Sequence, residues 1–502
     1  PVDLLWNGGI GTYVRATSET DAQVGDRAND PVRVTAKDVR AKAAGEGGNL
    51  GWTQAGRIEY ARNGGRINTD FIDNSAGVDT SDHEVNIKIL LDAEVAAGRI
   101  SEQERDELLP AMADDVASLV LRHNHSQNLA LANALSSDGP TAGVLEAWMC
   151  ELEESGHLDR AVDTMPSTTE MNRRMAAGER LASPELCTLL AWTKIALCDA
   201  VLATDLPEDP FVADRLVGYF PPLLRERFAE RMPTHRLHRE IITTEAVNRF
   251  VDSQGITAYY RLHLQTGADI AQVIRCQLAA RSVFGLGRVE TDLTHLGLDA
   301  VRTAKFRLAL TDLAMHTTRW FLNHGGADDI AGTIETYRPG VATLVEKLSE
   351  RLLGDSADAW QEKVDEVTEL GLDRSDAAVV AAYDWSPVLL SIVEISEEGH
   401  SLDEVADAYL TLARRVDMIR LTRLVEQLPQ DRPTDARVRA SLREDLLRVM
   451  SDATRRALVI GTDNVLADGG RIVKSIAANP DLAHCVVMVS DLRSAVGQEV
   501  TL

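Results

Sequence analysis

The chain has 502 residues, of which 44% are hydrophobic and 26% charged, and its formal net charge is -26 at pH 7. This length exceeds one ordinary hydrophobic core, and the composition is that of a globular protein rather than a disordered or membrane protein. Because so negative a chain repels a phosphate backbone, nucleic acid is not expected as a partner. No apolar run approaches the roughly 18 residues that cross a bilayer, so no membrane association is expected and the cytoplasm is the expected location.

The cysteines lie far apart and form no CxxC pair, which argues against both a disulfide framework and a zinc site. They are Cys150, Cys187, Cys198, Cys276 and Cys485. We therefore expect reduced, mostly buried thiols.

Residues 1–95 alternate short apolar runs with loops rich in glycine and asparagine. Three runs end in such loops: 2–6 before Asn7-Gly8-Gly9, 41–44 before Gly45-Glu46-Gly47-Gly48-Asn49, and 66–72 before Asp73-Asn74-Ser75. Helical stretches are predicted at 35–40 and 53–62, and a further helix around Asp79. This alternation is typical of a parallel α/β sheet, here part of a Rossmann-like one. Since ligands of such sheets bind beyond the carboxyl ends of the strands, the three loops should gather there.

After residue 95 the strand signals stop and helical periodicities continue along the chain. The segment Ser183-Pro184-Glu185 predicts a helix start, with Ser183 as the N-cap. Other helices are predicted over 102–134, 238–253, 270–284, 299–323, 333–353, 402–427 and 435–460. We therefore predict an α/β part at 1–95 and a large all-α domain at 96–502, which is open to further subdivision.

Two pairs of glycines follow the first two apolar runs, Gly8 with Gly9 and Gly47 with Gly48. Glycine lets backbone N–H groups approach a cofactor closely, but tight turns explain these positions equally well. Neither loop fits the Gly-x-Gly-x-x-Gly pattern that opens a helix in dinucleotide-binding domains. The glycines alone therefore do not establish a cofactor site.

Three polar residues near the loops have two interpretations each. Ser81 forms a capping box with Glu84, yet a serine at a helix start can also donate its hydroxyl to a substrate carboxylate, helped by the helix dipole. Asn49 and Asn74 follow successive apolar runs, and each amide can bond a ribose hydroxyl or an amide group. Asparagine is, however, also a common turn residue.

No metal site is predicted. His123 and His125 are two residues apart, so on a helix they point to different sides, and no nearby carboxylate completes a site.

The order and wording of the loops resemble those of glutamate dehydrogenases, in particular the large NAD-specific type found in bacteria. That family has a Glu-Gly-Ala-Asn loop after one strand and an Asn-Ala-Gly-Gly-Val-x-x-Ser segment after the next. The similar segments are 4–13, 25–30, 45–49 and 74–88. The resemblance is strong over residues 1–91, and the helical remainder resembles the family's C-terminal domain by position and composition, best at 179–186.

The resemblance implies oxidative deamination of L-glutamate to 2-oxoglutarate and ammonia, with NAD as the cofactor that accepts the hydride. Ser81 matches the family serine that binds the substrate side-chain carboxylate, and Val78 matches the apolar residue that lines the same pocket. Asn49 and Asn74 match asparagines that touch the cofactor. The two glycine pairs would lie in loops beside it, so residues 1–95 would be the C-terminal half of an NAD-binding domain.

The family's catalytic lysine and aspartate precede its dinucleotide-binding domain and are not found here. Lys37, Lys42 and Lys88 have surroundings that do not match the catalytic motif. Because the first residue is proline rather than methionine, we interpret the chain as a fragment or processed product that has no turnover of its own. It would act with the remainder of its own polypeptide, and a homo-oligomer is expected.

A second interpretation comes from the long helical region, which carries no site motif. The chain would then be a helical regulatory or oligomerisation module of a different NAD-dependent dehydrogenase, since one sheet can serve several substrates.

Overall fold

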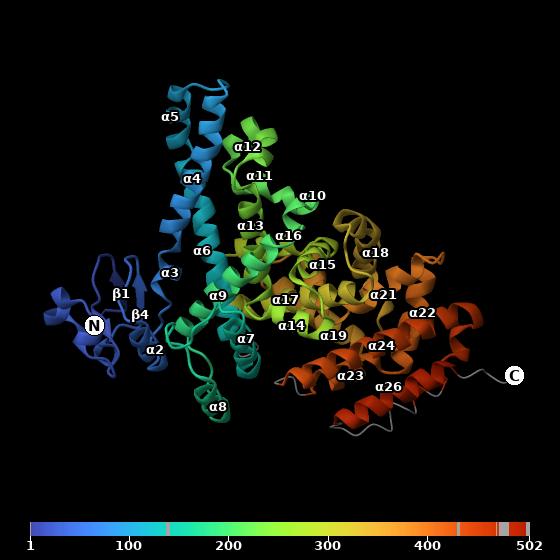
Figure 1. The fold of residues 1–502 in the computed structure, drawn as a ribbon. Helices are drawn as coiled ribbons and strands as arrows, with labels where there is room; N and C mark the ends of the chain where they lie inside the picture. The colour runs from blue at the N-terminus through green and yellow to red at the C-terminus, as the bar shows by residue number, and fades with distance from the viewer. Residues whose placement is uncertain (1, 137–140, 429–431, 468, 471–480, 498–502) are drawn as a thin grey trace. The chain divides into compact units, whose positions relative to one another are not determined.

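The computed structural model describes residues 2–136, 141–428, 432–467, 469–470 and 481–497 (Figure 1). The chain forms two compact units, Pro1–Ala258 and Tyr259–Leu502. Helices dominate both units, and the strands of the described part lie in the first fifty residues of the first unit. The prediction of an α/β segment followed by a large helical region is confirmed at this level.

The strands of the first unit form two small parallel sheets. Their bounds are β1 Leu4–Asn7, β2 Val14–Arg15, β3 Val34–Thr35 and β4 Ala43–Glu46. Strand β1 pairs with β4 in a register that runs from Leu4 opposite Ala43 to Asn7 opposite Glu46. Strand β2 pairs with β3. A core of apolar side chains supports these strands: Val14, Ala36, Ala44, Trp52, Tyr60 and Ile67.

Short helices accompany the strands: α1 Asp21–Val24, α2 Gln54–Arg62 and α3 Asp70–Asp73, with the 3-10 turns η1 Arg27–Val32 and η2 Ala36–Asp38. Helix α2 confirms the helix predicted at 53–62. The helix predicted at 35–40 is reduced to the single turn η2. The third apolar run is not a strand, because Arg66 makes only one bridge to Ala43 and α3 takes the second half of the run.

Two long helices, α4 Ser75–Ala96 and α6 Ala113–Leu135, pack side by side (Figure 1). Helix α5, Glu102–Ala111, connects them in the sequence. The prediction of one continuous helix at 102–134 was wrong, because the chain breaks at the buried Met112 between α5 and α6. Met112 caps α5 with φ -101° and ψ 1°, outside the α-helical range, although α5 itself runs through Pro110.

The remaining elements of the first unit are helical: α7 Ala142–Glu154, α8 Thr168–Ala176, α9 Ser183–Leu202, η3 Leu206–Glu208, α10 Pro210–Ala213, α11 Arg215–Tyr219, α12 Pro222–Phe228, η4 Ala229–Thr234 and α13 His238–Gln254. Helix α9 begins one residue earlier than predicted, at Ser183, with Ala182 rather than Ser183 as the N-cap. The Glu185 carboxylate accepts a hydrogen bond from the Ala182 N–H at 2.7 Å, while Ser183 donates to Asn68 at 2.8 Å. The Ser183 hydroxyl therefore makes a tertiary hydrogen bond with Asn68 and does not cap the helix.

The described part of the second unit is helical: α14 Ala258–Thr266, which begins at the last residue of the first unit, then α15 Ile270–Val283, α16 Leu286–His295, α17 Ala300–Asn323, α18 Ile330–Arg351, α19 Asp355–Glu369, α20 Arg374–Ala381, η5 Ala382–Asp384, α21 Ser386–Ser396, α22 Leu402–Arg415, α23 Met418–Glu426, α24 Pro433–Ile460, η6 Thr462–Asn464 and α26 Leu482–Gly497. Helix α17 packs against α15 and α21. The helix predicted at 402–427 is split at Asp417, whose φ of 48° is left-handed and breaks the helical path.

In the part of the chain that the structure describes, no single helix is both long and apolar enough to span a membrane. One pair of helical segments, Arg374–Asp384 and Ser386–Ser396, passes that test together by length and composition, but it is bent by 91°.

Candidate cofactor and substrate site

The two glycine loops meet beyond the carboxyl ends of β1 and β4. The carbonyl of Asn7, the last residue of β1, accepts hydrogen bonds from the N–H groups of Gly47 at 2.8 Å and Gly48 at 3.0 Å. A Cβ atom at Gly48 would lie 2.5 Å from the carbonyl oxygen of Gly9, which is closer than atoms can approach. The predicted meeting of these loops is therefore found, and Gly48 is glycine because its neighbour leaves no room for a side chain.

The indole of Trp6 covers two further glycines of the second loop. A Cβ atom would lie 2.7 Å from this ring at Gly45 and 2.8 Å from it at Gly47. Gly9 differs, because an added Cβ there would meet no atom within 4 Å. Packing within the chain thus accounts for glycine at 45, 47 and 48, whereas the space beside Gly9 is open to a ligand.

Helix α3 brings the third loop to the same place. The carboxylate of Asp73 accepts a hydrogen bond from the N–H of Glu46 at 3.0 Å, and that of Asp70 accepts one from the N–H of Leu50 at 2.8 Å. Burial raises the pKa of the Asp73 carboxyl, while the hydrogen bond from Glu46 opposes the rise. The two aspartates therefore fasten α3 to the loop after β4.

Asn49 and Asn74 are in direct contact. The side-chain amide of Asn74 donates a hydrogen bond to the Oδ1 atom of Asn49. Beside them Leu50 has a left-handed φ of 58°, and its carbonyl accepts a hydrogen bond from the hydroxyl of Thr12 at 2.7 Å. A non-glycine residue in this conformation is strained by about 1 kcal/mol, and such strain persists where surrounding bonds hold it.

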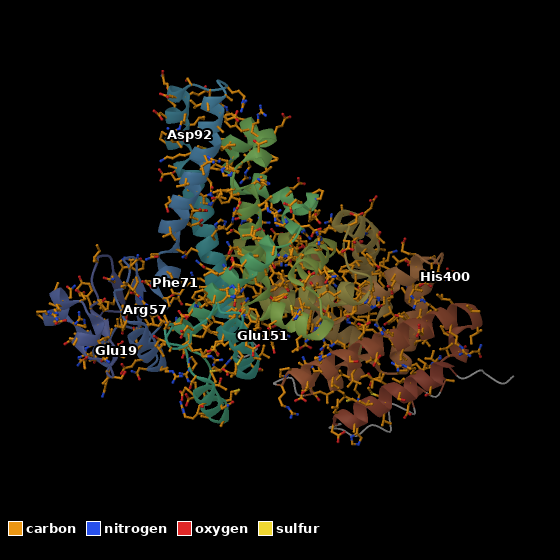
Figure 2. All side chains as sticks on the ribbon, viewed as in Figure 1. Glu19, Arg57, Phe71, Asp92, Glu151 and His400 are labelled. Atoms are coloured by element: carbon orange, nitrogen blue, oxygen red, sulfur yellow. The ribbon has the colours of Figure 1, made fainter. Side chains whose placement is uncertain are left out.

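A buried ion pair beneath the loops was not foreseen from the sequence. Arg57 lies on α2 (Figure 2). Its guanidinium is 2.7 Å from Glu46 and 3.2 Å from Asp70. Glu46 is fully buried, and burial raises the pKa of its carboxyl while Arg57 opposes the rise. Glu46 was visible in the sequence as part of the loop, but nothing there paired it with an arginine eleven residues on.

Ser81 does not cap a helix, so the capping-box interpretation was wrong. Helix α4 begins at Ser75, which places Ser81 in its second turn, and the Ser81 hydroxyl donates to the carbonyl of Val78 at 2.7 Å. The early start has a tertiary cause, because Asn124 and Gln127 of α6 both donate to the Ser75 hydroxyl at 2.8 Å. Since the dipole effect fades after the first turn, it contributes little at Ser81.

The predicted substrate and cofactor residues nevertheless form one line on α4. Asn74 immediately precedes the helix, and Val78 and Ser81 follow at spacings of four and three, which places all three on one helical face. Val78 is 67% exposed and Ser81 is also exposed. The line begins where Asn74 contacts Asn49, so the four residues run from the meeting point of the loops along an accessible face of α4.

The parallel strands, with loops gathered at the carboxyl ends of β1 and β4, and the long helical remainder define the class of protein: a small parallel α/β segment joined to a large helical part. Residues 1–134 match a family model described as the catalytic domain of bacterial NAD-glutamate dehydrogenase. Residues 178–499 match one described as the C-terminal part of glutamate dehydrogenase. The chain belongs to the bacterial NAD-glutamate dehydrogenase family, which confirms the resemblance seen in the sequence.

Three relatives named NAD-specific glutamate dehydrogenase are similar over most of the chain. The protein of Mycobacterium tuberculosis is 40% identical over 463 residues, which are 92% of this chain and 28% of the relative. The protein of Pseudomonas aeruginosa is 37% identical over 514 residues, which cover 100% of this chain and 31% of the relative. The protein of Halomonas elongata is 37% identical over 467 residues, which cover 92% of this chain and 29% of the relative. The chain thus spans between 28% and 31% of the length of these curated relatives.

Proposed function

We propose that this chain supplies one wall of the glutamate- and NAD-binding cleft of an NAD-dependent glutamate dehydrogenase, which converts L-glutamate to 2-oxoglutarate and ammonia. The observation that carries the proposal is the line of Asn49, Asn74, Val78 and Ser81, which starts at the carboxyl ends of the strands. The names of the relatives and the family match support the same reaction. The α/β segment would then be part of a Rossmann-like domain.

The residues beside the loops fit a dinucleotide. Gly9 leaves open space where a cofactor can approach the backbone, and the Nδ2 atom of Asn7 is buried with no hydrogen-bond partner in the described structure. A buried donor without a partner is costly, so a ligand that accepts from it is favoured. NAD, when bound, would take the hydride from glutamate, while Asn49 and Asn74 would hold its nicotinamide and ribose portions.

Ser81 would bind the side-chain carboxylate of glutamate. The single hydroxyl proton of Ser81 is donated to the backbone carbonyl of Val78 in this structure. The hydroxyl must therefore rotate away from that carbonyl before it can donate to a ligand. Val78, one turn earlier and largely exposed, would pack against the methylene groups of the substrate. Both roles need only the exposed face of α4.

The catalytic lysine and aspartate would be supplied by another part of the enzyme's polypeptide. Two lysines of the α/β segment are engaged in pairs at the surface, Lys42 with Asp3 and Lys88 with Glu84. Lys37 is exposed as well. The isolated 502-residue chain should therefore form no NADH from glutamate and NAD, and glutamate-dependent NADH formation by it would contradict this part of the proposal.

The test of the substrate site compares Ser81→Ala with Thr80→Ala in an active glutamate dehydrogenase polypeptide that contains this chain. Thr80 is a matched control, because it is exposed and its hydroxyl also bonds within α4, to the carbonyl of Ala76 at 2.6 Å. Ser81→Ala should lower kcat/KM for glutamate about tenfold or more, and Thr80→Ala should leave it unchanged. Equal kinetics of the two variants would overturn the assignment of Ser81.

The free cysteines support a reducing compartment such as the cytoplasm, because no disulfide is present in the described structure. The homo-oligomer stays a prediction.

A further inference from the structure

Three side chains with metal-binding atoms meet between α4 and α6. Asp79 and His83 are one turn apart on α4, and His123 comes from α6. One ligand atom from each lies within 4.8 Å of the others. The Asp79 carboxylate is 2.8 Å from Nδ1 of His123 and 3.7 Å from Nε2 of His83.

His83 has no hydrogen bond in the described structure, although it is fully buried. Neither of its ring nitrogens has a hydrogen-bond partner among the described residues. The ring is held by packing, because it stacks on Tyr219 with 4.1 Å between the ring centroids and an angle of 18°. A buried polar group without a partner is costly, and an apolar residue could fill the same space. A histidine here is explained if Nε2 binds a ligand that lies beside Asp79.

His123 has a carboxylate near each of its ring nitrogens, one of them beyond hydrogen-bond distance. Its Nδ1 faces Asp79, and its Nε2 lies 3.8 Å from the carboxylate of Glu245 on α13. Metal-binding histidines characteristically direct the second ring nitrogen to a carboxylate, which fixes the tautomer and makes the ligand more basic. Glu245 is 9% exposed, so it is placed to serve this role from outside the coordination shell.

We propose that Asp79, His83 and His123 bind a divalent transition-metal ion, with Zn²⁺ the best match. Two imidazoles and one carboxylate are ligands that zinc accepts, with bonds of about 2.0 to 2.2 Å. Ligand atoms around tetrahedral zinc are then separated by roughly 3.3 Å, and the two observed separations lie on either side of this value. Three protein ligands leave a coordination position for water.

Charge and access agree with such an ion. With neutral imidazoles, Asp79 and Glu245 carry two negative charges that a divalent cation balances. Asp79 and His123 keep 24% and 29% of their side-chain surface exposed, so the ion has a path from solvent. The sequence alone does not reveal this pairing, because Asp79 lies 44 residues before His123 in the chain. The bound ion would fasten α4, which carries Val78 and Ser81, to α6.

The experiment measures metal binding by the chelator-treated 502-residue chain. Titration calorimetry with ZnCl₂ should give one tight site per chain, and Co²⁺ should produce the visible absorption of a four-coordinate ion. His123→Gln and Asp79→Asn should each weaken Zn²⁺ binding about 100-fold, and Glu245→Gln should weaken it about tenfold. His125→Gln is the matched control, since His125 is exposed on the same helix, and it should bind like the parent chain.

Because His83 is buried, His83→Gln is interpreted only if its circular dichroism matches that of the parent chain. The Co²⁺ spectrum of the unaltered chain needs no variant and keeps the test independent of folding. Absence of tight, stoichiometric Zn²⁺ binding by the unaltered chain would overturn the proposal. So would equal affinities of the His123→Gln and His125→Gln variants. Neither result bears on Ser81, so the proposed function is tested separately.

Discussion

Arg57 and Glu46 form a buried ion pair in which Nε of the arginine lies 2.7 Å from Oε2 of the glutamate. The pair joins α2 to the end of β4, and the same carboxylate accepts a hydrogen bond from the N–H of Trp52 at 3.1 Å. Asp70 of α3 completes the network. Three segments that form the candidate site therefore share one buried cation.

Replacing that cation should destabilise the first unit strongly. Arg57→Met would leave Glu46 and Asp70 close together without a counter-charge, and breaking a buried pair in this way costs about 3–5 kcal/mol. Urea unfolding followed by tryptophan fluorescence measures the change, since Trp52 is buried in the same core.

The control is Lys42→Met, which removes an ion pair with Asp3 that is 79% and 80% exposed. Exposed pairs contribute at most about 1 kcal/mol, so this variant should unfold almost like the parent chain. If Arg57→Met and Lys42→Met lowered the free energy of unfolding equally, burial of the Arg57 pair would not increase its contribution to stability.

The glycine loops allow a second pair of variants. Gly48→Ala would place a Cβ atom 2.5 Å from the backbone of Gly9, so the loops must move apart, and overpacking of this kind costs roughly 1–3 kcal/mol. Gly9→Ala meets no atom within 4 Å and should leave stability within about 0.5 kcal/mol of the parent. Thermal unfolding compares them.

The same variants distinguish packing from cofactor binding. If NAD approaches the open side of Gly9, then Gly9→Ala should raise the KM for NAD in an active enzyme that contains this chain, without lowering its melting temperature. An unchanged KM for NAD would place the cofactor away from Gly9.

The local patterns of the sequence predicted several helices and the meeting of the first two loops. Helix α13, predicted at 238–253, is found at His238–Gln254, and it ends at Gly255, whose φ of 94° leaves the helical range. Glycine and asparagine after short apolar runs likewise predicted the contact between Gly9 and Gly48.

Predictions that depended on distant contacts were wrong or missing. Ser81 and Glu84 have the spacing of a capping box, but Asn124 and Gln127 bind Ser75, and the helix begins at Ser75, six residues before Ser81. A pattern in neighbouring residues cannot show that hydrogen bonds from a distant helix favour a different start of α4. For the same reason Glu46 was seen as a loop residue, and its partner Arg57 became evident only in the folded chain.

The thiols provide a third prediction. Burial raises the pKa of Cys187 and of Cys276 to about 12, and that of Cys198 to about 11. Because the thiolate is the reactive form, these three residues should resist alkylation by iodoacetamide at pH 8 in the native chain. Mass spectrometry identifies the labelled sites, and a sample unfolded in guanidinium should label all five cysteines. Rapid native labelling of Cys187 would contradict the burial found here.

His324 in the second unit should make that unit's stability depend on pH. Its ring is 12% exposed and lies between two carboxylates, with Nδ1 2.9 Å from Glu394 and Nε2 3.2 Å from Glu444. Burial opposes the charge, but the hydrogen bonds to these carboxylates outweigh it and raise the pKa of His324 to about 9. A histidine in the unfolded chain titrates near pH 6.5.

The folded state therefore keeps the His324 proton at pH values where the unfolded chain has lost it. The resulting stabilisation is fully present below about pH 6.5, amounts to at most roughly 3 kcal/mol, and is lost as the pH rises through 9. His324→Gln should be less stable than the parent at pH 6, with the difference shrinking toward pH 10, as measured by urea unfolding. His400→Gln, which alters an exposed histidine (Figure 2), should keep the pH profile of the parent. A difference that instead grew with pH would mean that His324 is neutral in the folded chain and that Glu394 and Glu444 do not hold its proton.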